Sequence, residues 1–141
     1  MKKKIAMQFP LKLKNYFFTH QEVIANPSHD ESAETENNID YDIAVETVNI
    51  SENSYGVNVK IYVDVEKNQN APYFFTIAAF GFIEVNMDQN KDITNEELKK
   101  LISSTGVSVL VGAIRERLAD MTARGPWAVC YLDILPLTEK K

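Results

Sequence analysis

The segment from Pro72 to Val85 constrains the fold most, because it is apolar on both faces of an extended chain. The two faces hold, first, Phe75, Ile77, Ala79, Ile83 and Val85 and, second, Phe74, Ala78, Phe80 and Phe82. A strand with two apolar faces must be covered twice. A helix can supply one cover, and another part of the chain, a partner subunit or a ligand must supply the other. Burial inside an oligomer and an exposed binding surface both remain open.

Three further segments alternate apolar and polar residues with period two, which is typical of half-buried strands. We predict strands at about residues 5–20, 39–50, 55–66 and 72–85. The polar residues 51–54 predict a hairpin turn between the second and third strands. Pro10 suggests a sheet edge or a bulge in the first strand. The polar stretch 26–38 is expected to be a solvated loop.

One long helix is predicted at about residues 95–123. Thr94 is a suitable N-cap, and Glu97 completes a capping box. Gly125 and Pro126 predict its end. Two apolar stripes run along this helix, namely Leu98, Leu101, Ile102, Thr105 and Val109, and then Val107, Leu110, Val111, Ile114, Leu118 and Met121. Two stripes predict burial on two sides, against the sheet and against something else.

Two glycines inside the predicted helix also favour a close contact. Gly106 and Gly112 each cost roughly 1 kcal/mol relative to alanine in a helix. That cost is tolerable where two backbones approach closely, so we expect a helix–helix contact there. A local kink or break at residues 103–106 is the alternative.

Composition restricts the class of protein. A net charge of -5 over 141 residues argues against binding to nucleic acid. No apolar run reaches the roughly 20 residues that span a bilayer, and polar residues interrupt any signal-like start after Lys2–Lys4. The single cysteine favours a reducing compartment. We therefore expect one cytoplasmic domain over residues 1–141.

No constellation of residues supports catalysis. His20 and His29 are the only histidines, and Cys130 lies between apolar neighbours, where a buried, unreactive thiol is expected. Phosphate loops, nucleophile elbows and Cys-x-x-Cys motifs are absent from the sequence. We expect no enzyme activity, no metal site and no cofactor.

The C-terminal third resembles the SecB family of export chaperones. The resemblance rests on residues 101–106 (LISSTG), 112–116 (GAIRE) and 121–127 (MTARGPW), followed by the apolar segment 131–136. It implies an α+β fold in which one long helix packs on a four-stranded antiparallel sheet, with an apolar tail at 126–137. Arg115, Glu116 and Arg124 match the family pattern, and we expect them to have structural roles.

The resemblance also implies a function. Family members are holdases that bind unfolded or presecretory polypeptides without a cofactor and deliver them to the SecA motor for export. They assemble as tetramers, as dimers of dimers, through their helices. The implied oligomer interface is Gly106, Leu110, Gly112 and Ile114.

The resemblance implies two further surfaces. The candidates for the polypeptide-binding groove are Phe74, Phe80, Phe82, Trp127, Tyr131, Leu132 and Leu135. Core packing is the alternative for each, and the preferred one for Trp127. The candidates for a SecA-facing acidic surface are Asp40, Asp42, Glu46, Asp64, Glu66 and Glu84. A simply solvated outer face is the alternative.

The sequence departs from the family where it stops shortly after Pro136, because many members continue into a second C-terminal helix there. A dedicated chaperone for a single partner, such as an antitoxin, is therefore an alternative function. A binding module without chaperone activity and a purely structural subunit are two more.

Overall fold

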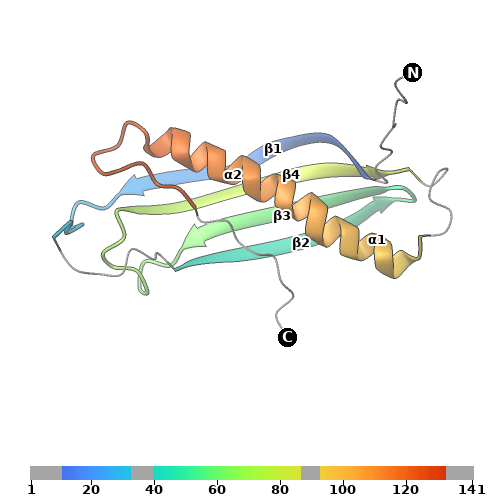
Figure 1. The fold of residues 1–141 in the computed structure, drawn as a ribbon, viewed down its shortest axis with the longest axis horizontal. Coiled ribbons are helices and arrows are strands. Elements are labelled where there is room, and N and C mark those ends of the chain that lie inside the picture. The colour runs from blue at the N-terminus through green and yellow to red at the C-terminus, as the bar shows by residue number, and fades with distance from the viewer. Residues whose placement is uncertain (1–10, 33–39, 87–92, 133–141) are drawn as a thin grey trace, which may run out of the picture.

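A long helix lies across one face of a four-stranded antiparallel sheet in the computed structural model (Figure 1), which describes residues 11–32, 40–86 and 93–132. The sheet order is β1-β4-β3-β2. The strands are β1 (Leu11–Ala25), β2 (Tyr41–Ser51), β3 (Ser54–Val63) and β4 (Tyr73–Val85). The predicted α+β fold is confirmed. β1 runs past its predicted end, while residues 5–10 lie outside the described residues.

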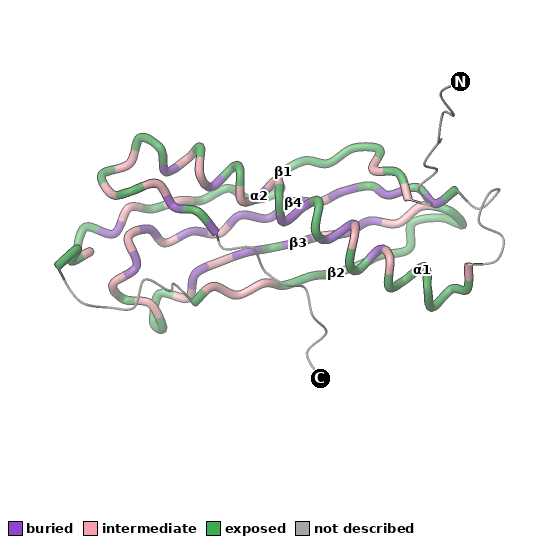
Figure 2. The backbone as a smooth tube through the Cα atoms, viewed as in Figure 1, coloured by how far each residue is buried: buried purple, intermediate pink, exposed green. Residues whose placement is uncertain are grey.

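The position of β4 explains its two apolar faces. It is hydrogen-bonded to β1 on one side and to β3 on the other. Its odd-numbered residues are buried beneath the helix, whereas Phe80 is half-buried and Phe82 exposed on the opposite face. Figure 2 shows buried residues concentrated along β3 and β4. The structure thus supplies one of the two covers that this strand requires.

The helix consists of α1 (Asn95–Leu101), a π-helical turn η1 (Ile102–Gly106) and α2 (Val107–Thr122). Its N-terminus is capped as predicted, since the Glu97 backbone N–H donates to Thr94 Oγ1 at 3.2 Å. The hairpin turn is confirmed too, because Ser51 pairs with Ser54.

Of the two predicted helix stripes, the chain's own sheet buries most of the second, but only Leu98 and Ile102 of the first. Seven buried residues recur every four positions along the helix, namely Leu98, Ile102, Gly106, Leu110, Ile114, Leu118 and Thr122, and Val107 and Val111 are buried beside this row. In a regular α-helix each step of four residues turns the row by about 40°, so the row would leave the sheet. The wider turn η1 offsets part of this drift. It lies where the sequence suggested a kink.

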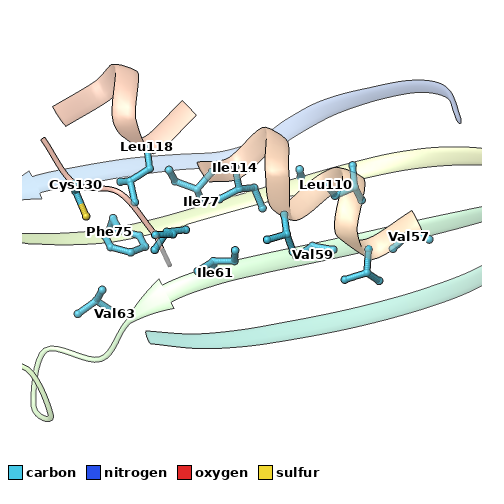
Figure 3. Close-up of a cluster of buried hydrophobic side chains, with 14 of the residues drawn as sticks. Val57, Val59, Ile61, Val63, Phe75, Ile77, Leu110, Ile114, Leu118 and Cys130 are labelled. Atoms are coloured by element: carbon cyan, nitrogen blue, oxygen red, sulfur yellow. The ribbon is translucent and has the colours of Figure 1, made fainter. Parts of the chain in front are cut away.

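The core lies between this row and β3–β4. Figure 3 shows Ile114, Leu110 and Leu118 above Ile61 and Ile77, and none of these five side chains exposes measurable surface. Val109, by contrast, points away from the sheet and is 46% exposed. Burial on a second side of the helix therefore stays a prediction about an assembly.

Glycine is required at position 125 because a side chain there would overlap a buried residue. The helix ends just before it, at Thr122, and the φ of Gly125 is not positive. A Cβ at Gly125 would overlap the hydroxyl and ring of Tyr73, which is 2% exposed. Gly112, by contrast, has nothing within 4 Å of its Cβ position.

The Gly125→Ala substitution is expected to lower the free energy of unfolding by roughly 1–3 kcal/mol, because the buried ring must shift. Gly112→Ala is the control, and it should raise that free energy by up to about 1 kcal/mol through helix propensity. Urea unfolding followed by circular dichroism measures both. Effects of the same sign and size would contradict this account.

Candidate polypeptide-binding surfaces

Three aromatic rings gather on the open face of the sheet, the face opposite the helix. Phe17 comes from β1, and Phe80 and Phe82 come from β4. Their ring centroids lie 5.8 Å apart for Phe17 and Phe80, 6.1 Å for Phe17 and Phe82, and 5.0 Å for Phe80 and Phe82. Phe17 remains 45% exposed and Phe82 37% exposed. We call these three residues the aromatic cluster.

A glycine on β3 shapes this surface. The Phe80 ring occupies the space that a Cβ on Gly56 would take, and Ile50 Cδ1 lies 3.3 Å from the same point. An aromatic side chain over a cross-strand glycine shields its backbone and helps to fix the register. Val48, which pairs with Gly56, and Ile50 extend the apolar surface onto β2. The open-face patch is therefore Phe17, Val48, Ile50, Phe80 and Phe82.

Phe74 lies on the same face but outside the patch. It pairs with Ile24 at the far end of β1, whereas Phe80 pairs with Phe17. Six residues of strand separate Phe74 from Phe80, which is about 20 Å. The predicted group of three β4 phenylalanines is thus split into a pair and a separate residue.

Two of the predicted groove residues of the tail, Trp127 and Leu132, pack on the helix-covered side. Trp127 is held through its backbone, because Tyr73 Oη donates to Trp127 O at 3.2 Å and accepts from Trp127 N at 3.1 Å. Leu132 is 4% exposed, and its carbonyl accepts a 2.9 Å bond from Arg115 Nε. Arg115 thus has the structural role that was expected. Tyr131 is 74% exposed.

One groove formed by all seven predicted residues does not exist within the described chain. Strand alternation points Phe80 and Phe82 away from the helix side, so the sheet itself separates them from Trp127 and Leu132. Phe74, near the far end of β4, packs against the core as Trp127 does. Leu135 lies outside the described residues. The prediction of a single groove is corrected to an open-face patch and a packed tail.

Two buried polar side chains hold this tail and the adjoining loops. Thr122 Oγ1 donates to Leu118 O at 2.8 Å and accepts from Cys130 N at 2.9 Å. Asn26 Nδ2 donates to Ala71 O at 2.8 Å, and Asn26 O accepts from Trp127 Nε1 at 3.0 Å. Asn26 is 3% exposed, so this end of the predicted solvated loop is packed.

Cys130 and His29 lie in environments that indicate structural roles. Cys130 is buried as predicted, and burial raises the pKa of its thiol to about 11. His29 packs edge-on against the Trp127 ring with centroids 4.9 Å apart, and its Nδ1 lies 2.6 Å from Asn70 O. Among the described residues no three His, Cys, Asp or Glu side chains converge as a metal site. No described helix is long and apolar enough to cross a membrane.

The predicted acidic surface is split. Asp42, Glu46 and Glu84 lie on the open face, where Glu84 pairs with Lys14 at 3.4 Å. Asp40 and Asp64 lie instead at the corner where β2 begins and β3 ends, and both carbonyls accept bonds from the Asn68 amide. Glu66 follows in the same turn, its N–H bonded to Asp64 Oδ1. Asp42, opposite Tyr62, lies next to this corner, whereas Glu84, opposite Ser54, lies at the other end of the sheet, so the six residues do not all form one continuous surface.

Most of the predicted interface residues face inward. Leu110 and Ile114 are fully buried against the chain's own sheet, and a Cβ on Gly106 would meet Ile83 Cδ1 at 2.5 Å. These three residues cannot present side chains to a partner, so that part of the prediction is wrong. Gly112 is exposed and stays a prediction.

Comparison with known families decides the relationship. The family described as preprotein translocase subunit SecB matches residues 13–136, a span that contains β2, β3, β4 and the whole helix. The chain belongs to the SecB family. SecB-family proteins are chaperones and not enzymes, so this chain is a chaperone.

Solved structures share the SecB fold. A SecB-like chaperone of Mycobacterium tuberculosis, in complex with a ChAD peptide from the HigA1 antitoxin, matches with a TM-score of 0.60 and 18% identity, over 89% of this chain and 91% of that chain. A protein of unknown function from Streptococcus agalactiae matches with a TM-score of 0.53 and 10% identity, over 88% of this chain and 97% of that chain. At such identities the likeness concerns the fold. No curated protein matches.

Proposed function

We propose that this SecB-family chaperone is a holdase that binds unfolded polypeptides on the open-face patch. The observation that carries the proposal is the exposure of Phe17, Val48, Ile50 and Phe82, at 37–49% each, on one face of the sheet. Contiguous exposed apolar surface on a folded protein marks a site of interaction. Apolar burial has no directional requirement, so such a patch accepts many client sequences.

The family also suggests which clients are bound, where they are held and how the subunits assemble. Clients would be presecretory chains held in the cytoplasm and delivered to the SecA motor by a homotetramer built as a dimer of dimers. The exposed Val109 and Gly112 on the outer face of α2 are compatible with helix contacts between subunits.

A dedicated chaperone for one partner is the second candidate. The observation that favours it is the M. tuberculosis SecB-like chaperone, whose structure contains a peptide from an antitoxin. Such a chaperone would use the same surface for a single recurrent sequence.

Aggregation of a guanidinium-denatured reporter, diluted into buffer without ATP, tests the holdase proposal. Light scattering should fall progressively as the chaperone concentration rises. No suppression at a large molar excess would contradict the proposal. Affinity capture from the host lysate then separates the two candidates, since many presecretory chains indicate export and one repeated partner indicates a dedicated chaperone.

A further inference from the structure

The open-face patch lies close to the start of β1. Leu11, the first residue of β1, pairs with Val85, and Phe82 of the patch lies three residues before Val85 on β4. β4 ends at that same Val85. Pro10, which precedes Leu11, has no N–H to donate to a ladder. The described part of β4 therefore offers no partner for a continuation of β1 towards residue 1.

Residues 1–10 combine apolar and basic side chains. Ile5, Met7 and Phe9 occupy every second position, so in an extended segment their side chains point to one side. Three consecutive lysines, residues 2–4, precede them. Such a segment is complementary to a surface that is apolar close to β1 and negatively charged farther away.

The open face of the sheet has this distribution. The open-face patch lies next to the start of β1, and two carboxylates, Asp42 and Glu46, lie beyond it on β2. The described residues show no ion pair for either of them, and Lys60, on the neighbouring strand, lies over a tyrosine ring instead. Glu84, near the start of β1, is already paired with Lys14 at 3.4 Å. The carboxylates that remain for another cation are those on β2.

The length of the segment matches the width of this surface. From Leu11 to Glu46 the sheet extends about 17 Å along the strands and about 14 Å across them, which is about 22 Å directly. Residues 4–10 span up to about 23 Å when extended. A segment that starts at Leu11 can therefore cross the patch and bring its lysines to Glu46.

We propose that residues 1–10 dock on the open-face patch of their own chain and compete there with clients. The three apolar residues pack against the aromatic cluster, and the three lysines face Glu46 and Asp42. The tether to β1 keeps the local concentration of the segment high. A client has to displace the segment, so its apparent affinity falls with the fraction of chains that are open. The inference rests on the proposed holdase function and adds a regulation of the same surface.

A nitroxide label tests the docking without any client. It is attached through Ala6→Cys, because the native Cys130 is buried and burial disfavours its reactive thiolate. In the labelled full-length chain, the methyl NMR signals of Val48 and Ile50 should lose most of their intensity. The methyl signals of Val109 should keep theirs, because the sheet separates that residue from the open face.

Val109 is a matched reference for position along the sheet. Its neighbour Leu110 lies on the helix side near the same end of β1, since a Cβ on Gly81 would meet both Leu110 and Leu13 at 3.2 Å. A segment that moves freely about Leu11 would reduce the signals on both faces equally, and that result overturns the inference. Unchanged open-face signals overturn it too. An equal loss in unlabelled chains mixed with labelled ones also overturns it, in favour of docking on a second copy.

Release of the segment should tighten client binding. Changing all three lysines at 2–4 to glutamate should restore the open-face signals. It should also raise the affinity for an unfolded reporter at least about threefold, as expected if two thirds of the chains are closed. The same change at Lys67, Lys99 and Lys100, three exposed lysines outside the patch, is the control and should alter affinity less than about twofold. Unchanged affinity on release, or an equal gain in the control, overturns the inference.

The two measurements separate this inference from the proposed function. If the label shows no docking while the reporter binds, the holdase proposal stands and the inference is wrong. If the segment docks but neither the wild type nor the released variant binds the unfolded reporter, the docking stands and the holdase proposal is wrong.

Discussion

The Phe82→Asp substitution is expected to weaken binding of a denatured reporter by at least about tenfold, which corresponds to about 1.4 kcal/mol. Phe82 is 37% exposed and contacts the rings of Phe17 and Phe80. A carboxylate in that position must lose water when a client covers the patch, and burying an unpaired charge is strongly unfavourable. Fluorescence anisotropy of a labelled, permanently unfolded reporter measures the change.

Val65→Asp is the matched control for this prediction. Val65 is 50% exposed in the turn after β3, away from the open-face patch. Its substitution introduces the same charge and should change the affinity by less than about twofold. Equal losses of affinity in the two variants would indicate a general effect of charge. Unchanged binding by Phe82→Asp would show that clients do not bind the open-face patch.

The Ile114→Ala substitution should have the largest effect on stability, lowering the free energy of unfolding by roughly 2–5 kcal/mol. Ile114 exposes no surface and lies in the middle of the helix row that faces the sheet. Removing its side chain loses apolar burial and leaves a cavity. Val109→Ala, on the exposed side of the same helix, should cost less than about 0.5 kcal/mol.

Chemical denaturation at several protein concentrations decides between this core role and an interface role. A core residue gives a loss that does not depend on concentration. A small loss that grows on dilution would mean that Ile114 stabilises subunit contacts instead, as the family resemblance implied.

Local patterns predicted the elements well because their causes are local. The cap at Thr94 needs only Glu97 three residues later, and the hairpin at Ser51–Ser54 needs only two alternating strands with a polar turn between them. The two apolar faces of β4 follow from period-two alternation. The family resemblance supplied the arrangement of these elements as one sheet and one helix.

Features that depend on distant residues were not predictable in this way. The helix row follows the sheet through a π-helical turn, which a constant period of 3.6 residues per turn does not predict. Asn26 and Thr122 resemble surface polar residues in sequence, yet they bond backbone groups of distant or returning segments. Phe80 and Phe82 of β4 and Trp127 of the tail share a chemistry, but only the tertiary structure shows that they lie on opposite faces.

Site-specific photo-crosslinking to an unfolded reporter tests the central claim, that clients bind the open face of the sheet. A photoreactive residue is placed at Phe82 on the open-face patch or at Lys99 on the exposed side of α1. We predict strong crosslinks from Phe82 to the unfolded reporter, weak ones from Lys99, and none from either position to the native reporter. Crosslinks that are as strong from Lys99 as from Phe82, or as strong to the native reporter, would contradict the account.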